Sequence, residues 1–155
     1  MDVLIIMGSK SDIEIGKKAL ATLQKLGLKA KMTVASAHRT PDVVKELVEK
    51  SGARVFITIA GLSAALPGFV AAHTTKPVIG VPVSGKVSLD SLLSVTQMPP
   101  GIPVAAVGLD AGENAAVLAA QILGITDEGV NSNIAEYRNE LRQKVLKDAE
   151  EINGV

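Results

Sequence analysis

The sequence predicts an α/β domain built on a five-stranded parallel sheet. Short apolar runs alternate along the chain with segments whose apolar residues recur at helical spacing, the pattern of βαβ units. The chain has 155 residues, 47% of them hydrophobic, which is enough for one domain with a substantial core. We therefore interpret residues 1–155 as a single domain, with a core of about 1–124 and an additional C-terminal helix of about 131–153.

The first half of the chain predicts two βα units. Residues 3–7 form an apolar first strand, and the helix that follows carries apolar residues at helical spacing until Gly27 ends it. Residues 29–34 alternate like a second strand. Thr40 and Pro41 then open the next helix, because proline is favoured at the first helical position.

The second half predicts three more strands with their helices. The third strand is residues 55–59, and it leads through a loop into a short helix of small residues. The remaining elements are strands at 77–81 and 104–107, and helices at 90–96, from 110 to about 124, and at about 131–153. The helical segment 115–123 is apolar on nearly every side, and residues 131–152 carry an apolar stripe, so we expect a homo-oligomer with segment 115–123 buried between subunits.

Composition excludes several classes of function. Lysine plus arginine and aspartate plus glutamate both total 16, so no basic surface indicates nucleic acid or an anionic membrane. Aromatic residues make up only 2% of the chain, which argues against flavin stacking and single-strand nucleic-acid binding. The chain has no cysteine and no apolar run of membrane-spanning length, and its first residues lack signal-peptide features, so we expect a cytoplasmic protein.

Polar or glycine-rich loops follow the predicted strands, at the edge of a parallel sheet where ligands bind. The first loop, residues 8–12, reads GSKSD and precedes a helix, where free N–H groups attract phosphate. Ser9 supplies a hydroxyl donor, and Asp12 suits a sugar hydroxyl rather than a phosphate. The alternative is ordinary helix capping, with Ser11 and Glu14 forming a capping box.

The second loop, residues 36–41, reads SAHRTP and places two functional side chains together. Arg39 offers a planar donor pair for phosphate, and His38 is suited to proton transfer near neutral pH. A structural histidine is the alternative, but the place of His38 between a strand end and a helix start favours chemistry. The other histidine, His73, has no such place, and we leave it out of the site.

The third loop, residues 60–68, reads AGLSAALPG and carries almost no functional side chain. It therefore indicates close approach of backbone to a ligand, with tight helix–sheet packing as the alternative. Beyond it, residues 84–86 are candidates for a mobile flap, and Gln97 and Met98 are candidates for a pocket edge.

Six segments together resemble, in order, the PurE family of purine biosynthesis. They read MGSKSD, SAHRTP, AG…ALPG, PVIGVPV, SLLSVTQMPPGIPVA and AGENAAVLAAQIL, and the match runs from about residue 1 to residue 123. The resemblance implies a flavodoxin-like three-layer sandwich, a homo-octamer with shared sites, and an enzyme without metal or organic cofactor. Its members include N5-carboxyaminoimidazole ribonucleotide mutase and the catalytic subunit of phosphoribosylaminoimidazole carboxylase, which carboxylates aminoimidazole ribonucleotide directly with CO2. Both make 4-carboxyaminoimidazole ribonucleotide.

The resemblance also implies roles for individual residues. It assigns phosphate and ribose contacts to Ser9 and Asp12, phosphate to Arg39 and proton transfer to His38. We expect four further residues to complete the substrate-binding site: Ser36, Gly61, Ser63 and Leu66.

One position departs from the bacterial mutases of the family. Ala65 stands where they carry a second active-site histidine in GGAAHLPG, and the pattern around it is similar to that of the direct carboxylases. The LPG and QMPPG segments are typical of the mutases, so we expect the mutase, with direct carboxylation as the alternative.

Two other classes compete with an enzyme of this family. A phospho-receiver module needs an acceptor aspartate after the third strand, where this chain has Gly61, so that interpretation fails. A non-catalytic nucleotide-binding subunit would carry similar phosphate loops. His38 is the residue that favours chemistry over binding alone.

Overall fold

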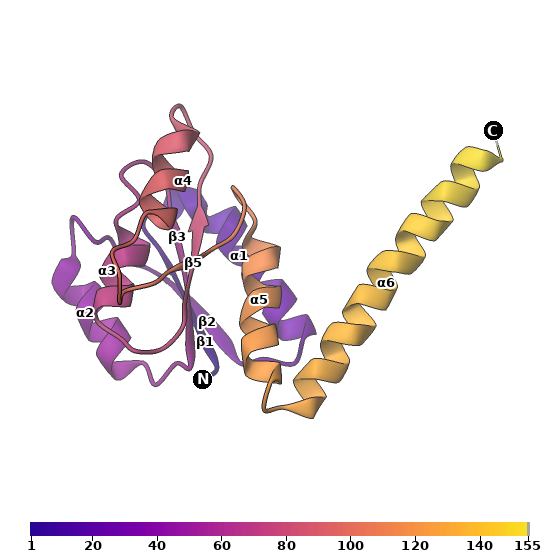
Figure 1. Ribbon diagram of the computed structural model, residues 1–155, viewed down its shortest axis with the longest axis horizontal. Coiled ribbons are helices and arrows are strands. Elements are labelled where there is room, and N and C mark those ends of the chain that lie inside the picture. Colours follow the sequence, from indigo (N-terminus) through magenta and orange to yellow (C-terminus); the bar gives the residue numbers. More distant parts are fainter. Residues whose placement is uncertain (155) are drawn as a thin grey trace.

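The computed structural model describes residues 1–154 and shows a parallel β-sheet between two layers of helices (Figure 1). The sheet order is β2-β1-β3-β4-β5, with all strands parallel. This is the flavodoxin-like order: β2 is added on one side of β1, and β3, β4 and β5 are added on the other, so the strand order reverses between β1 and β3. In chain order the strands are β1 (Val3–Met7), β2 (Ala30–Val34), β3 (Val55–Ala60), β4 (Val78–Pro82) and β5 (Ala105–Ala106). The predicted fold class is confirmed.

Alternate residues of the buried strands serve the two faces of the sheet. Ile5 packs with the helices α1 and α5 on one face, and Ile6 packs with α2, α3 and α4 on the other. The helices are α1 (Ile13–Lys25), α2 (Pro41–Lys50), α3 (Leu66–Ala72), α4 (Ser88–Thr96), α5 (Gly112–Gly124) and α6 (Glu128–Asn153). A 3₁₀ turn, η1 (Lys10–Asp12), precedes α1.

Several elements differ from their predicted bounds by one to three residues, and two of these differences have a clear physical cause. Only Ala105 and Ala106 pair in β5, where the sequence predicts residues 104–107, because this edge strand has one neighbour and follows Pro103, which lacks an N–H. The C-terminal helix begins at Glu128, earlier than predicted, because the Asp127 side chain accepts a hydrogen bond from the Val130 N–H at 3.1 Å.

Helix α5 is covered by its own chain, which corrects the reason for expecting it between subunits. Its alanines pack against α1, the sheet and the start of α6, and Ala116 and Ala120 have no exposed surface. A Cβ at Gly112 would stand 2.5 Å from the Ile15 carbonyl oxygen, so glycine permits α5 to approach α1. Partial exposure is confined to Val117, Leu118 and Ile122 among the large apolar residues of this helix.

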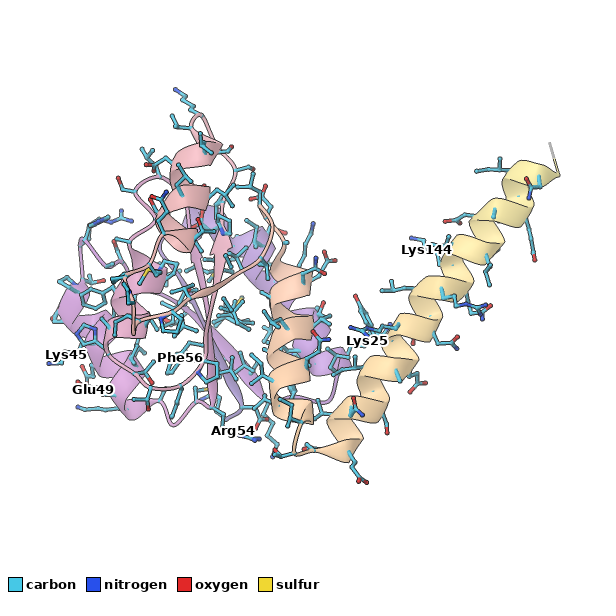
Figure 2. All side chains as sticks on the ribbon, in the orientation of Figure 1. Lys25, Lys45, Glu49, Arg54, Phe56 and Lys144 are labelled. Carbon is cyan, nitrogen blue, oxygen red and sulfur yellow. The ribbon has the colours of Figure 1, made fainter. Side chains whose placement is uncertain are left out.

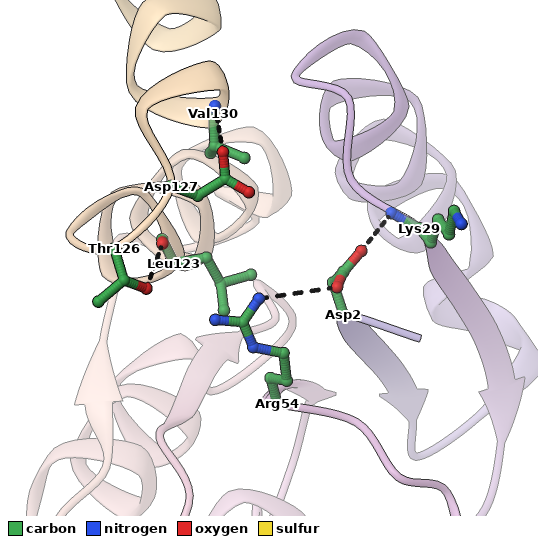
Figure 3. Close-up of polar contacts among 7 residues, drawn as sticks. All are labelled: Asp2, Lys29, Arg54, Leu123, Thr126, Asp127 and Val130. Carbon is green, nitrogen blue, oxygen red and sulfur yellow. Dashed lines mark hydrogen bonds and ion pairs between the residues drawn. The ribbon is translucent and has the colours of Figure 1, made fainter.

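Polar contacts connect the amino ends of three strands, at the edge opposite the polar loops (Figure 3). The Asp2 carboxylate accepts a hydrogen bond from the Lys29 N–H at 2.9 Å, and the Arg54 guanidinium lies 3.9 Å from it. These contacts align the starts of β1, β2 and β3, which leaves the carboxyl edge for function.

Helix α6 begins on the domain and then extends away from it (Figure 1). Val130 and Ile134 are buried against α5, and a hydrogen bond to Glu140 raises the pKa of Lys25 on α1. Beyond this pair, Lys144 lies on a part of α6 that is remote from the sheet (Figure 2). No helix within residues 1–154 is both long and apolar enough to cross a membrane.

Candidate active site

A cavity of about 390 Å³ opens at the carboxyl edge of the sheet, beside the reversal between β1 and β3. The loops after β1, β2 and β3 line it. It brings together all the residues predicted for catalysis or substrate binding: Ser9, Asp12, Ser36, His38, Arg39, Gly61, Ser63 and Leu66. Their roles toward a ligand stay predictions.

The first loop is organised differently from the predicted capping box. The Ser9 side chain caps the η1 turn by accepting a hydrogen bond from the Ser11 N–H at 3.3 Å. The Ser11 hydroxyl donates to the Asp12 carboxylate at 2.9 Å, and Glu14 pairs with Lys17 instead of reaching back. The predicted capping box is therefore wrong, because Ser11 lies inside the turn rather than before it.

Asp12 is the buried charge of the cavity. It stands at the N-cap position of α1 with 6% of its surface exposed, and its side chain does not cap that helix. The Ser11 hydroxyl occupies Oδ1, which leaves capacity on the carboxylate to accept from a hydroxyl group of a ligand.

The second loop is held by hydrogen bonds within its own sequence. The Ser36 N–H donates to the Thr40 hydroxyl oxygen at 3.0 Å, and the Arg39 N–H donates to the Ser36 hydroxyl oxygen at 3.3 Å. The Arg39 guanidinium donates to the Gly8 carbonyl oxygen at 3.0 Å, which ties this loop to the one after β1. The Arg39 Nε–H also donates to the Ser36 hydroxyl oxygen at 3.4 Å, so two guanidinium donors hold this side chain at the cavity wall.

The two histidines occupy different environments. His38 is exposed at the cavity wall, between the end of β2 and the start of α2. His73 stacks on Phe69 with ring centroids 4.5 Å apart, and its Nδ1 lies 2.7 Å from the Phe69 carbonyl oxygen. The structure places His73 away from this cavity, in agreement with the sequence prediction.

The third loop presents backbone and small aliphatic groups to the cavity. Leu66 is buried at the start of α3, whereas Leu62 is 76% exposed at the cavity rim. Ser63 has a positive φ of 51°, and its N–H donates to the Asp90 carboxylate at 2.6 Å. Ala65, which the sequence comparison aligns with a histidine of the bacterial mutases, also lines the cavity.

Two segments that the sequence associates with the pocket do not behave as predicted, and two residues at or near the cavity were not predicted. Gln97 and Met98 do not line this cavity, because Met98 packs against Gly68 on α3. The Ser84 N–H and hydroxyl both donate to the Asp110 carboxylate, so the base of the proposed flap is fixed. Leu62 and Asp90 were missed by sequence reasoning, which had no polar motif or periodicity to indicate them.

The fold and cavity define an α/β protein with a polar pocket at the strand reversal, lined by serine hydroxyls together with Asp12, His38 and Arg39. The AIR carboxylase family model matches residues 2–144. N5-carboxyaminoimidazole ribonucleotide mutase of Methanocaldococcus jannaschii is 54% identical over 97% of this chain and 96% of that protein. A crystal structure of Treponema denticola PurE superposes with a TM-score of 0.85 at 31% identity, over 96% of each chain. The chain belongs to the AIR carboxylase family, the PurE family of the sequence prediction.

Relatives of this family differ in length. The probable N5-carboxyaminoimidazole ribonucleotide mutase of Methanobrevibacter smithii is 54% identical over 97% of this chain, which spans 45% of that relative. The segment matched by this chain therefore makes up nearly all of some relatives and less than half of others.

Proposed function

We propose that this chain is an N5-carboxyaminoimidazole ribonucleotide mutase of purine biosynthesis, forming 4-carboxyaminoimidazole ribonucleotide. The observation that carries the proposal is the cavity, which places His38 and Arg39 opposite a wall of backbone and aliphatic groups. The mutase names of relatives that match nearly the whole chain support it.

The cavity suits a ribose phosphate. Arg39 and Ser9 offer donors to phosphate oxygens, and the N–H groups that begin η1 and α1 add a favourable dipole. Asp12 accepts from ribose hydroxyls with its remaining lone pairs. Ser36, bonded to Arg39, lines the same side and keeps the guanidinium in place.

The chemistry then needs one acid/base group and a dry wall. The N5 carbamate loses CO2, and C4 of the electron-rich imidazole attacks this CO2 to form the new carbon–carbon bond. His38 removes the C4 proton and restores aromaticity; a proton is returned to N5 in the overall isomerisation. The aliphatic third loop from Gly61 to Leu66 retains CO2 by excluding water.

Direct carboxylation of aminoimidazole ribonucleotide is the second candidate. The observation that favours it is Ala65, which lines the cavity where bacterial mutases carry a histidine. Both routes share the attack of C4 on CO2 and the loss of the C4 proton, so they differ in the source of CO2.

Product formation from two starting materials separates these candidates. We expect rapid conversion of N5-carboxyaminoimidazole ribonucleotide and slow conversion of aminoimidazole ribonucleotide with bicarbonate. Faster use of the second pair at equal concentration would establish the carboxylase instead. Nucleotide binding without either conversion would identify a non-catalytic subunit.

We also propose that the chain assembles as a homo-octamer, the number eight coming from the family resemblance. Its support in the structure is the distal half of α6, where Leu141, Val145 and Ile152 are 48%, 66% and 76% exposed. Light scattering should return about eight times the chain mass of 16.0 kDa. Val145→Glu should reduce this mass and Lys144→Glu should not; a monomeric wild type would reject the assembly.

The cytoplasmic location stays a prediction.

A further inference from the structure

The third loop of the cavity depends on a contact from outside the loop. Ser63 adopts a φ of 51°, a left-handed conformation that residues with a side chain rarely adopt. Its N–H donates at 2.6 Å to Oδ2 of Asp90, which lies 27 residues further along the chain in the first turn of α4. Asp90 itself does not line the cavity.

Helix α4 is a firm support for this contact. The fully buried Ser91 hydroxyl lies 2.8 Å from the Val83 carbonyl oxygen at the end of β4, and Val95 is buried against the sheet. Asp90 is therefore fixed relative to β4, and through its carboxylate it fixes Ser63. The charged acceptor makes this hydrogen bond stronger than a neutral one.

We propose that Asp90 is a positioning residue that holds the third loop in the shape required for turnover. Without its carboxylate, Ser63 would relax toward negative φ, and the N–H and C=O groups on either side of it would rotate. The wall from Gly61 to Leu66 would then lose its fixed geometry toward the ligand. The effect on rate rests on the proposed function, whereas the effect on the loop does not.

The experiment compares Asp90→Ala and Asp90→Asn with the wild type in two measurements. Hydrogen exchange of residues 61–66 reports the loop directly, and kcat/KM with N5-carboxyaminoimidazole ribonucleotide reports its consequence. Asp90→Ala should raise exchange and lower kcat/KM, each about tenfold, as expected for loss of one charge-assisted hydrogen bond. Asp90→Asn retains a carbonyl acceptor and should stay within about threefold of the wild type in both.

A double-mutant cycle with Ser63→Gly separates positioning from general stability. Glycine adopts positive φ readily, so Asp90→Ala should change exchange and kcat/KM only about twofold in the Ser63→Gly background. Glu113→Ala, which removes a first-turn carboxylate from α5, is the matched control and should leave exchange of residues 61–66 unchanged.

Unchanged exchange in Asp90→Ala overturns the proposal, as does an undiminished effect of Asp90→Ala when residue 63 is glycine. Equal damage in Asp90→Asn and Asp90→Ala also overturns it, because the hydrogen bond would then not be the cause. A wild type without turnover would reject the proposed function, while the exchange measurements would still test the role of Asp90.

Discussion

The two walls of the cavity differ in where most of their stabilising side-chain contacts come from. The loop from Ser36 to Thr40 carries the functional side chains and is braced by hydrogen bonds among its own residues. The loop from Gly61 to Leu66 presents backbone and aliphatic groups, and Asp90 anchors it from a distant helix. The conformation of the loop that carries His38 and Arg39 is thus set largely by neighbouring residues in the sequence. The conformation of the loop from Gly61 to Leu66 depends on how a distant helix packs in the tertiary fold.

This difference matters for what a substitution does. In the braced wall, replacing a side chain removes a chemical group while the loop retains several other bonds. In the anchored wall, the groups facing the ligand belong to the backbone. Substitutions there act by filling space in the cavity or by changing the conformation of the loop. The following variants test whether the two walls divide in this way.

The largest effect should come from His38→Asn. Asparagine forms hydrogen bonds but cannot exchange a proton at neutral pH, so we expect kcat to fall about 10²-fold or more with nucleotide affinity largely retained. His73→Asn is the matched control, because His73 packs on Phe69 outside this cavity. Turnover near the wild-type value in His38→Asn would remove the catalytic role of the braced wall.

Arg39→Ala should mainly weaken binding. Loss of a charge-assisted contact to phosphate should lower ribonucleotide affinity about 10- to 100-fold, measured by calorimetry. Arg39 also donates to the Gly8 carbonyl oxygen, so a purely structural role predicts a lower melting temperature with unchanged affinity. Arg54→Ala, at the opposite edge of the sheet beside Asp2, controls for the loss of an arginine.

Gly61→Ala tests the close approach of backbone in the anchored wall. A Cβ at Gly61 would meet Val83 at 3.7 Å, an ordinary contact, so the protein should fold with little change in melting temperature. Because Gly61 lines the cavity, an added methyl group would restrict how closely a ligand can approach this backbone, and we expect affinity to fall about tenfold. Gly85→Ala, with open space around its Cβ, should leave affinity unchanged. Unchanged affinity in Gly61→Ala would mean that this backbone does not contact the ligand.

The same division explains how far the sequence could predict the molecule. Periodicity located β1 at Val3–Met7, and Pro41 located the start of α2, because both signals are local. The carboxyl-edge rule placed His38 and Arg39 beside Ser9 and Asp12 in one cavity. No local pattern connects Asp90 to Ser63, since their contact depends on how α4 packs on the sheet.

The sequence also could not predict which part of the molecule covers an apolar helix. An apolar helix such as α5 needs cover, but composition does not distinguish α1 and α6 of the same chain from a second subunit. The interface predicted at residues 115–123 stays a prediction, and the exposed apolar residues Val145 and Ile152 belong to the apolar stripe that the sequence also indicates on α6.

Thr40→Ala should give the smallest effect, and it tests the internal bracing itself. The Thr40 hydroxyl accepts from the Ser36 N–H at 3.0 Å and lies 3.3 Å from the Ser36 carbonyl oxygen, while it does not cap α2. Its loss should reduce the free energy of unfolding by about 1 kcal/mol. For a chain of this size the melting temperature should then fall by about 2–4 °C. Thr40→Ser keeps the hydroxyl and should melt close to the wild type.

The value of kcat/KM in Thr40→Ala should change less than in Gly61→Ala, because the bonds from Arg39 to Ser36 and Gly8 still hold the loop. Comparing the two variants therefore measures how redundantly each wall is held. If Thr40→Ala instead reduces turnover as much as His38→Asn, one hydroxyl supports the whole catalytic loop. The braced wall would then be as dependent on a single contact as the wall that Asp90 anchors.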